Sequence, residues 1–180
     1  MQWQHTQGLT SRSFTCGHCG NLVASAAGYL ADGGHMIHTC PHCNEPTYFR
    51  ATEQIPGVAP GSPVANVPAE IAALYGEARS CAAANAFTAS VMASRKLLMN
   101  IAVSRGAKAG EPFITYVEYL ASQGYVPPDG RGWVDHIRKK GNEATHEIVL
   151  MNREAATDLI TFTEMLLKFI FEFPVELASI

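Results

Sequence analysis

Residues 133–146, WVDHIRKKGNEATH, are the stretch around which we expect the rest of the chain to be organised. The stretch begins with a helical pattern, which Gly141 and Asn142 interrupt. Three consecutive cations at 138–140 precede the break, and His146 follows Asn142 by about one helical turn. We predict that the long helical patterns on either side act as a scaffold for this segment.

Apolar residues recur at helical spacing in the C-terminal half of the chain. The spacing predicts four helices, over about 68–83, 86–104, 112–122 and 153–171. The start of residues 133–146 adds a fifth helical pattern. Asn152 is suited to cap the last helix, and Pro174 is expected to end it. We therefore predict a bundle of four to five helices.

Two Cys-x-x-Cys motifs near the N-terminus, at residues 16–19 and 40–43, are separated by about twenty residues, as in many zinc sites. Between them, the apolar stretches 22–30 and 35–39 are joined by Asp32-Gly33-Gly34, which is typical of a hairpin turn. Residues 47–53 are expected to add a third strand. This layout predicts a small β zinc ribbon whose ligands are Cys16, Cys19, Cys40 and Cys43.

Disulfide bonds or chance spacing are the alternatives to a metal site. The doubled motif and a reducing compartment favour Zn²⁺ over both. Four thiolates would complete a tetrahedral coordination and leave no position for water, so the predicted zinc is structural and not catalytic. Four histidines are alternative ligands, which we expect at the surface or beside the true ligands: His18, His35, His38 and His42.

The composition indicates a mainly α protein with a β segment at its start. Residues 1–53 form the predicted zinc ribbon, with residues 1–14 as a flexible lead that holds at most a short strand at 13–15. Residues 54–67, QIPGVAPGSPVANV, are rich in proline and glycine and are predicted to be a linker. Residues 68–180 form the predicted helical domain.

Charge and hydrophobicity limit the possible partners. Hydrophobic residues make up 47% of the chain and charged residues 16%, which is typical of a globular protein. The net charge of -3 provides no overall attraction for nucleic acid, so any phosphate contact must be local. No apolar run is long enough to span a membrane, and residues 1–14 lack the apolar region of a signal peptide. We therefore expect a cytoplasmic protein.

Four short motifs give the helical half a family resemblance: PAEI at 68–71, YGEA at 75–78, ASRKLL at 93–98 and IRKKGNEATH at 137–146. Residues 66–174 resemble the HEPN superfamily of helical bundles and, more narrowly, the bacterial domain-of-unknown-function family 4145 (DUF4145). Members of that family often carry an N-terminal zinc ribbon. The resemblance and the apolar last helix together predict a homodimer.

Many HEPN proteins are metal-independent ribonucleases in which two chains share one cleft, with an Arg-Asn-x-x-x-His motif. Asn142 and His146 match this motif, whereas Gly141 stands in place of the arginine. The resemblance implies His146 as general acid or base, Asn142 as an orienting group, and Arg138, Lys140 or Arg95 as the cation. The candidate ligands for RNA phosphate are Arg138, Lys139 and Lys140.

A structural role for the same segment is the alternative. Gly141 would then break the helix, Asn142 would cap the next turn, and His146 would bond a backbone carbonyl. Because the motif lacks its arginine, we predict a non-catalytic or regulatory module in nucleic-acid transactions such as phage defence, restriction or toxin–antitoxin systems. The alternatives are a metal-independent RNA endonuclease or toxin using His146, and a dimeric adaptor between proteins. RNA or a nucleic-acid-processing protein is the expected partner.

Overall fold

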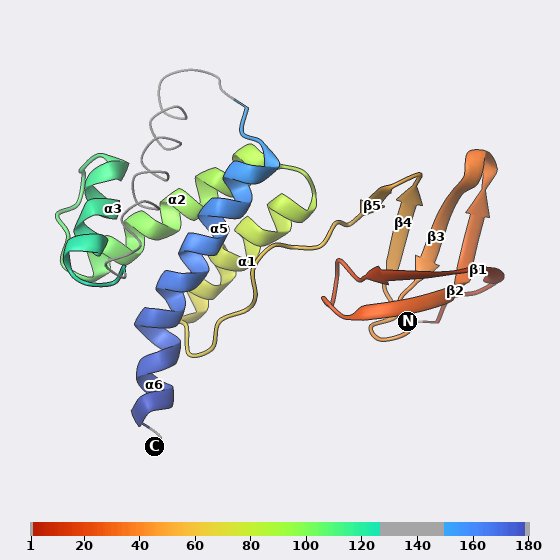
Figure 1. The fold of residues 1–180 in the computed structure, drawn as a ribbon, viewed down its shortest axis with the longest axis horizontal. Helices are drawn as coiled ribbons and strands as arrows, with labels where there is room; N and C mark the ends of the chain where they lie inside the picture. Colours follow the sequence, from red (N-terminus) through yellow and green to blue (C-terminus); the bar gives the residue numbers. More distant parts are fainter. Residues whose placement is uncertain (1, 127–149, 179–180) are drawn as a thin grey trace. The chain divides into compact units, whose positions relative to one another are not determined.

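The computed structural model describes residues 2–126 and 150–178, and it divides the chain into two compact units (Figure 1). The β unit comprises Met1–Ala59 together with Ala83–Asn85, and the α unit comprises Pro60–Ala82 together with Ala86–Ile180. The predicted organising stretch 133–146 lies outside the described residues, as do its candidate site residues Asn142 and His146.

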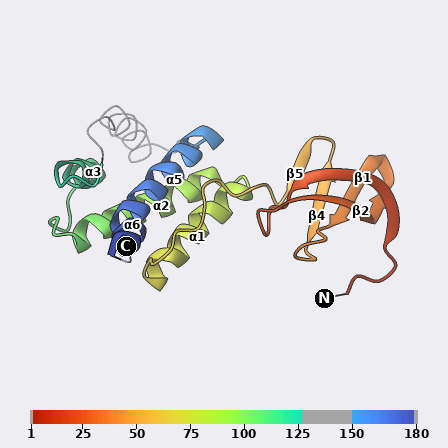
Figure 2. The ribbon, with the colours of Figure 1, turned by 60° about the horizontal axis from the view of Figure 1, so that its bottom comes forward.

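The β unit is an antiparallel sheet whose strands follow one another in chain order, from β1 to β5. Figure 2 shows β1 and β2 as its long, curved strands. An irregularity in pairing between Gly8 and Arg12 of β1 accompanies this curvature, as β-bulges commonly do. The strands are β1 (Gln7–Thr15), β2 (Leu22–Ala31), β3 (His35–Thr39), β4 (Pro46–Arg50) and β5 (Glu53–Ile55).

Two expectations for the β unit are wrong. Residues 1–14 are not a flexible lead, because β1 begins at Gln7 and its polar side chains suit the exposed edge of the sheet. Residues 47–53 are not one strand, because Ala51 has a φ of 51° and the chain turns there between β4 and β5. The predicted turn between β2 and β3 is present at Asp32–Gly34, where Gly33 and Gly34 have positive φ values.

The buried core of the β unit is very small. It consists of two aromatic rings and two cysteines, Phe14, Phe49, Cys16 and Cys40, with Val23 and the other two cysteines partly buried against them. The ring centroids of Phe14 and Phe49 are 5.0 Å apart. So little buried apolar surface cannot by itself offset the conformational entropy of ordering about fifty residues.

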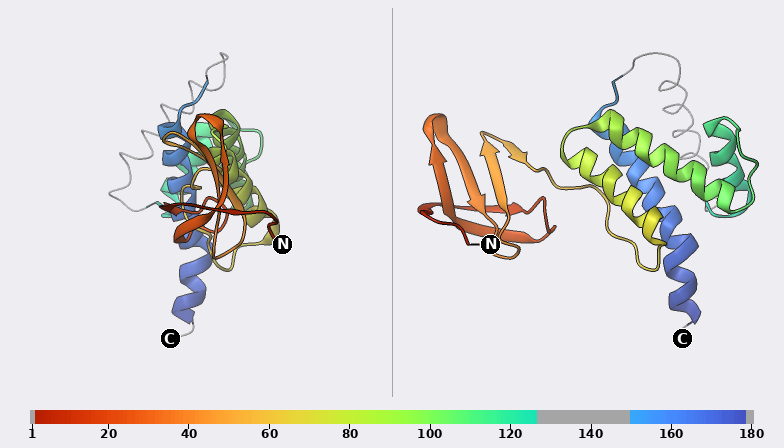
Figure 3. Two further views of the ribbon diagram at one scale, coloured as in Figure 1. Left: turned by 90° about the vertical axis from the view of Figure 1, so that its right-hand side faces the viewer. Right: turned by 180° about the vertical axis from the view of Figure 1, so that it is seen from behind.

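The α unit is a bundle in which α2 packs against both α3 and α5 (Figures 1 and 3). On α2, the Ser90 hydroxyl donates a hydrogen bond of 2.8 Å to the Ala78 carbonyl on α1, so α1 joins the same bundle. Its helices are α1 (Ala69–Ala83), α2 (Phe87–Ser104), α3 (Phe113–Ser122), α5 (Arg153–Leu167) and α6 (Phe173–Ala178).

Apolar side chains at helical spacing form one continuous core in the α unit. The fully buried members include Leu98, Ile101, Val117, Leu120, Ile160, Phe162, Leu166 and Leu167. The predicted mainly α class therefore describes the α unit, whereas the β unit is a five-stranded sheet. Within the described part of the chain, no helix has the length and apolar character needed to cross a bilayer.

Pro174 does not end the last helix, contrary to expectation. A π-helical turn at Lys168–Glu172 follows α5, and α6 continues from it. The Phe173 N–H bonds to the Lys168 carbonyl, five residues back. This wider turn accommodates a proline, which has no N–H to donate and would crowd the carbonyl four residues earlier in an α-helix.

The Gly76→Ala variant is expected to stabilise the α unit by about 0.5–1 kcal/mol. Gly76 lies inside α1, and a Cβ placed there meets no atom within 4 Å. Alanine would therefore restrict the unfolded chain without crowding the folded one. Thermal unfolding followed by circular dichroism at 222 nm measures the change. The control is Gly106→Ala, which should destabilise, because Gly106 has a φ of 105° and its Cβ would lie 3.0 Å from the Tyr119 hydroxyl.

Candidate metal centre

The two Cys-x-x-Cys motifs fold into the same turn, here called a knuckle. In the first knuckle, the Cys16 N–H donates to the Asn21 carbonyl at 2.9 Å and the Gly20 N–H donates to the Cys16 carbonyl at 2.8 Å. Gly20 has a positive φ, which glycine adopts without strain. The equivalent bonds of the second knuckle run from Asn44 N–H to the Cys40 carbonyl, 2.8 Å, and from Cys40 N–H to the Glu45 carbonyl, 2.9 Å.

The knuckles bring the four predicted ligand sulfurs together. The Sγ atoms of Cys16 and Cys43 are 3.7 Å apart, those of Cys19 and Cys40 are 3.9 Å apart, and all four lie within 4.8 Å of one another. A tetrahedral zinc site with Zn–S bonds of about 2.3 Å has sulfur–sulfur separations of about 3.8 Å. All four cysteines are free thiols, so the geometry fits a four-thiolate metal ion and not a pair of disulfides.

The four thiols are not electrostatically equivalent without a metal ion. A hydrogen bond from the Asn21 side chain is the largest cause that lowers the pKa of Cys19, to about 6. Burial raises the pKa of Cys43 to about 12 and also raises the pKa of Cys16. A divalent cation among the sulfurs would favour the thiolate form of every ligand.

Histidines brace the knuckles from outside the sulfur cluster. His18, in the first knuckle, donates from Nε2 to the carbonyl of Pro46 at 2.9 Å. His42, in the second, accepts a hydrogen bond of 3.2 Å at Nδ1 from the Asn21 amide. Each histidine therefore links its own knuckle to the chain segment that forms the other one, beside the cluster and outside its ligand set.

The other two candidate histidines lie farther into the sheet. His35 hydrogen-bonds through Nδ1 to the Tyr48 hydroxyl, and the two rings stack. His38 is fully buried, with its ring against Phe14 and Phe49. Over residues 2–126 and 150–178, the four cysteines are the one group of three or more His, Cys, Asp or Glu side chains close enough to share a metal ion.

Sequence reasoning missed two residues that support the metal centre. Asn21 contacts Cys19 as well as His42, since its amide also donates to the Cys19 carbonyl at 3.3 Å. Trp3 donates from its indole nitrogen to the Asn44 carbonyl at 2.8 Å, which ties the N-terminal segment to the second knuckle. Asn21 directly follows Gly20 at the end of the first knuckle, and an amide side chain so close to a ligand was a visible signal. Nothing in the sequence indicated Trp3.

Arg95 is the one candidate catalytic residue that the structure describes. It lies on α2, with its guanidinium carbon 4.5 Å from the centroid of the Phe113 ring on α3. Burial lowers the pKa of this guanidinium. The remaining candidates lie outside the described residues: Arg138, Lys139, Lys140, Asn142 and His146.

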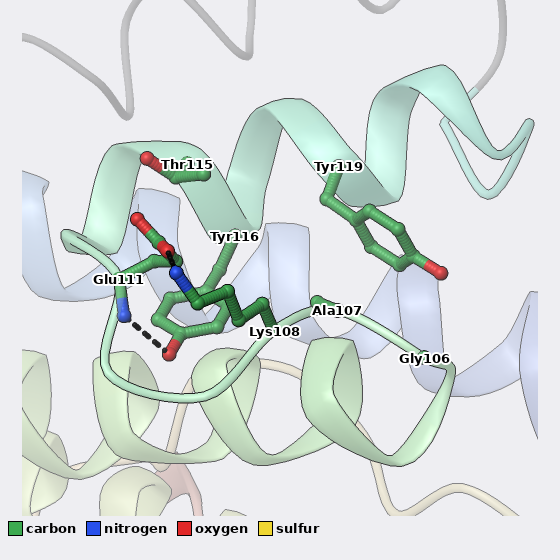
Figure 4. A pocket seen from close by; sticks show the side chains of 7 residues that line it. All are labelled: Gly106, Ala107, Lys108, Glu111, Thr115, Tyr116 and Tyr119. Carbon is green, nitrogen blue, oxygen red and sulfur yellow. Dashed lines mark hydrogen bonds and ion pairs between the residues drawn. The ribbon is translucent and has the colours of Figure 1, made fainter.

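A pocket of about 380 Å³ lies between the α2–α3 loop and α3 (Figure 4). Its polar groups pair with each other: Lys108 forms a 3.0 Å ion pair with Glu111, whose backbone N–H donates to the Tyr116 hydroxyl at 3.0 Å. The acid and the base of this pocket are therefore paired with each other. Its lining residues are Gly106, Ala107, Lys108, Glu111, Thr115, Tyr116 and Tyr119.

The helical part of the chain is the part that matches a known protein family. Neither curated proteins nor solved structures give a match. The model of one family, described as a domain of unknown function (DUF4145), matches residues 76–180, which is more than half of the chain and covers nearly all of the α unit. On that match, the chain belongs to the DUF4145 family.

Proposed function

We propose that the β unit is a structural zinc ribbon, that the α unit is a HEPN-like bundle, and that the chain acts as a non-catalytic or regulatory module in nucleic-acid transactions. The observation that supports this proposal is the grouping of the four cysteine sulfurs within 4.8 Å of one another, with separations of 3.7 and 3.9 Å across the two knuckles. Phage defence, restriction and toxin–antitoxin systems are the settings that the family resemblance suggests.

A zinc ion held by Cys16, Cys19, Cys40 and Cys43 would cross-link the two knuckles and would have no open coordination position for a substrate. The chain supplies the rest of the site through backbone N–H groups of the knuckles and through the Asn21 amide, which hydrogen-bond to the sulfurs of Cys16, Cys19 and Cys43. These groups orient the ligands and stabilise thiolates. A closed site of this kind contributes to folding and not to chemistry. The non-catalytic role that we propose for the α unit follows from Gly141, which stands in place of the arginine of the ribonuclease motif.

The charge distribution favours the α unit as the nucleic-acid contact. Both arginines of the β unit already have partners: Arg50 forms a 2.6 Å ion pair with Glu53, and Arg12 lies 4.0 Å from the centroid of the Phe49 ring. The α unit carries three consecutive cations at residues 138–140, in addition to Lys96 and Arg105. Few phosphate contacts are therefore expected, with a correspondingly modest dependence on salt.

Replacing Arg138, Lys139 and Lys140 together by alanine is expected to weaken binding to RNA at least tenfold at about 50 mM salt. Each cation that pairs with a phosphate releases counterions, so the slope of log affinity against log salt should also become shallower by about 1–3. Fluorescence anisotropy with a labelled single-stranded RNA over a range of salt concentrations measures both quantities. The matched control is Arg50→Ala, which removes a cation already paired with Glu53 and should leave affinity unchanged.

Unchanged RNA affinity in the triple variant would argue for a protein adaptor instead. The same preparations also test the ribonuclease alternative. Wild type and His146→Ala, incubated with RNA in a buffer without added metal ions, should show equal background cleavage. Cleavage by wild type that His146→Ala abolishes would replace our proposal with a metal-independent ribonuclease. Light scattering on the same samples tests the proposed homodimer.

A further inference from the structure

Residues 60–65, here called the strap, lie along the α unit and are held through their main chain. At one end, the Arg79 guanidinium on α1 donates from Nε to the Pro60 carbonyl at 2.9 Å and from Nη2 to the Gly61 carbonyl at 2.8 Å. The planar Arg79 guanidinium thus binds two consecutive carbonyls at once, which the single ammonium group of a lysine could not do in the same geometry.

Two carboxylates hold the rest of the strap by its N–H groups. Glu164 on α5 accepts a hydrogen bond from the Ser62 N–H at 3.0 Å, and Glu172 in the π turn accepts one from the Ala65 N–H at 2.7 Å. Hydrogen bonds to a charged acceptor are stronger than those between neutral groups. Together with Arg79, these residues bind both carbonyls and N–H groups of one segment.

The π turn explains how Glu172 reaches the strap. In an uninterrupted α-helix, residues eight apart are rotated from one another by about 80°. The wider turn at Lys168–Glu172 reduces that rotation, so Glu172 faces the same segment as Glu164. Lys168 neutralises Glu164 through a 2.6 Å ion pair on the carboxylate oxygen that does not contact the strap.

Two strap positions select a residue type: Val64, which packs against the hydrophobic core of the α unit, and Gly61. Its φ is 70°, and a Cβ there would lie 2.7 Å from the Tyr75 hydroxyl, 2.8 Å from Glu164 Oε2 and 3.0 Å from Ile160 Cγ2. Ile160 is fully buried and Tyr75 nearly so, and Glu164 is held at both oxygens, so none of these atoms can move aside easily. Burial of Tyr75, with a contribution from Glu164, also raises the pKa of its phenol, so the hydroxyl stays neutral.

We infer that these side chains of α1, α5 and the π turn form a binding site for a peptide that has a glycine in the left-handed conformation, and that residues 60–65 of a second copy of the chain can replace the strap in it. The polar contacts are to main-chain groups and the apolar contact is made by the Val64 side chain, so an identical copy of the segment satisfies them equally. Because the strap is covalently attached, its effective concentration is of the order of millimolar, and exchange requires that the resident strap be weakened. Segment exchange between identical chains adds no new type of contact and is a low-cost route to a dimer.

A fluorescent peptide of residues 58–67 tests this inference with the full-length protein. The Gly61→Val variant should eject its own strap and bind the peptide at least tenfold more tightly than wild type does. Wild type should bind it only near millimolar concentration, because its site is occupied. A peptide with valine in place of the glycine should bind neither protein, and adding Arg79→Ala to the Gly61→Val variant should remove the gained affinity.

The Ser62→Pro variant provides an independent way to weaken the strap, because it deletes the N–H that Glu164 accepts and adds no atom at Gly61. It too should gain affinity for the peptide. Helical unfolding followed at 222 nm establishes that each variant is folded. If neither folded variant gains affinity, or if wild type shows no binding at millimolar peptide, the site does not accept the segment in trans and the inference is wrong.

Discussion

Removing zinc with a strong chelator is expected to unfold the β unit and to leave the α unit folded. The buried core of the β unit contains only Phe14, Phe49 and two cysteines, whereas the α unit has a continuous apolar core of its own. Structural zinc sites contribute about 10–16 kcal/mol in small zinc-dependent peptides, which is comparable to the whole stability of an ordinary domain. The sheet should therefore form only in the zinc-bound protein.

Tryptophan fluorescence can follow the β unit by itself. The indole of Trp3 donates to the carbonyl of Asn44 in the second knuckle and packs edge-on against Tyr29. In a Trp133→Phe background, Trp3 is the remaining tryptophan of the chain. Chelation should shift its emission to longer wavelength, zinc should restore it, and the ellipticity at 222 nm from the helices should change little.

Cysteine variants show whether the four sulfurs are responsible. Cys16→Ser should lower the affinity for zinc by several orders of magnitude, because it removes one of four thiolates. Cys81→Ser is the matched control, since Cys81 lies on α1 outside the cluster, and it should bind one zinc per chain as wild type does. A metal-free protein that retains the Trp3 emission of the folded state would refute a structural zinc site.

Local patterns made most of the fold predictable. The helices α1, α2 and α3 lie within a residue or so of their predicted limits, because apolar spacing specifies them locally and because Gly106 and Gly124 follow α2 and α3. The four cysteines were equally accessible to sequence reasoning, since metal ligation imposes a fixed residue type at a fixed spacing.

The parts that could not be predicted depend on contacts distant in sequence. Strand β1 is polar and lacks alternation, and it is recognisable only from its pairing with β2. Whether Pro174 ends the last helix depends on whether the preceding turn can widen into a π turn. The position of the strap depends on the carboxylates of Glu164 and Glu172, about one hundred residues away. Of the catalytic candidates, only Arg95 lies in the described part of the chain, so the histidine mechanism remains a prediction.

Gly28→Ala is expected to destabilise the β unit by about 3 kcal/mol, as overpacking of a well-packed site does. Gly28 lies on β2 opposite His38 of β3, and a Cβ there would come within 1.8 Å of the Ile37 carbonyl oxygen and 2.9 Å of the Ile37 carbonyl carbon. Both are backbone atoms, so no side-chain rotation relieves the collision. The strands themselves must separate.

This separation is expected to reach the metal centre, because β3 leads directly into Cys40 of the second knuckle. Metal binding and folding are coupled in such a unit, so 3 kcal/mol of lost folding energy corresponds to about a hundredfold weaker zinc affinity. Competition with a chromogenic chelator measures that affinity. Gly8→Ala is the matched control: Gly8 pairs with Ala27 in the same sheet, but its Cβ would meet nothing within 4 Å. Equal zinc affinities in the two variants would mean that the close approach of β2 and β3 does not determine the position of the second knuckle.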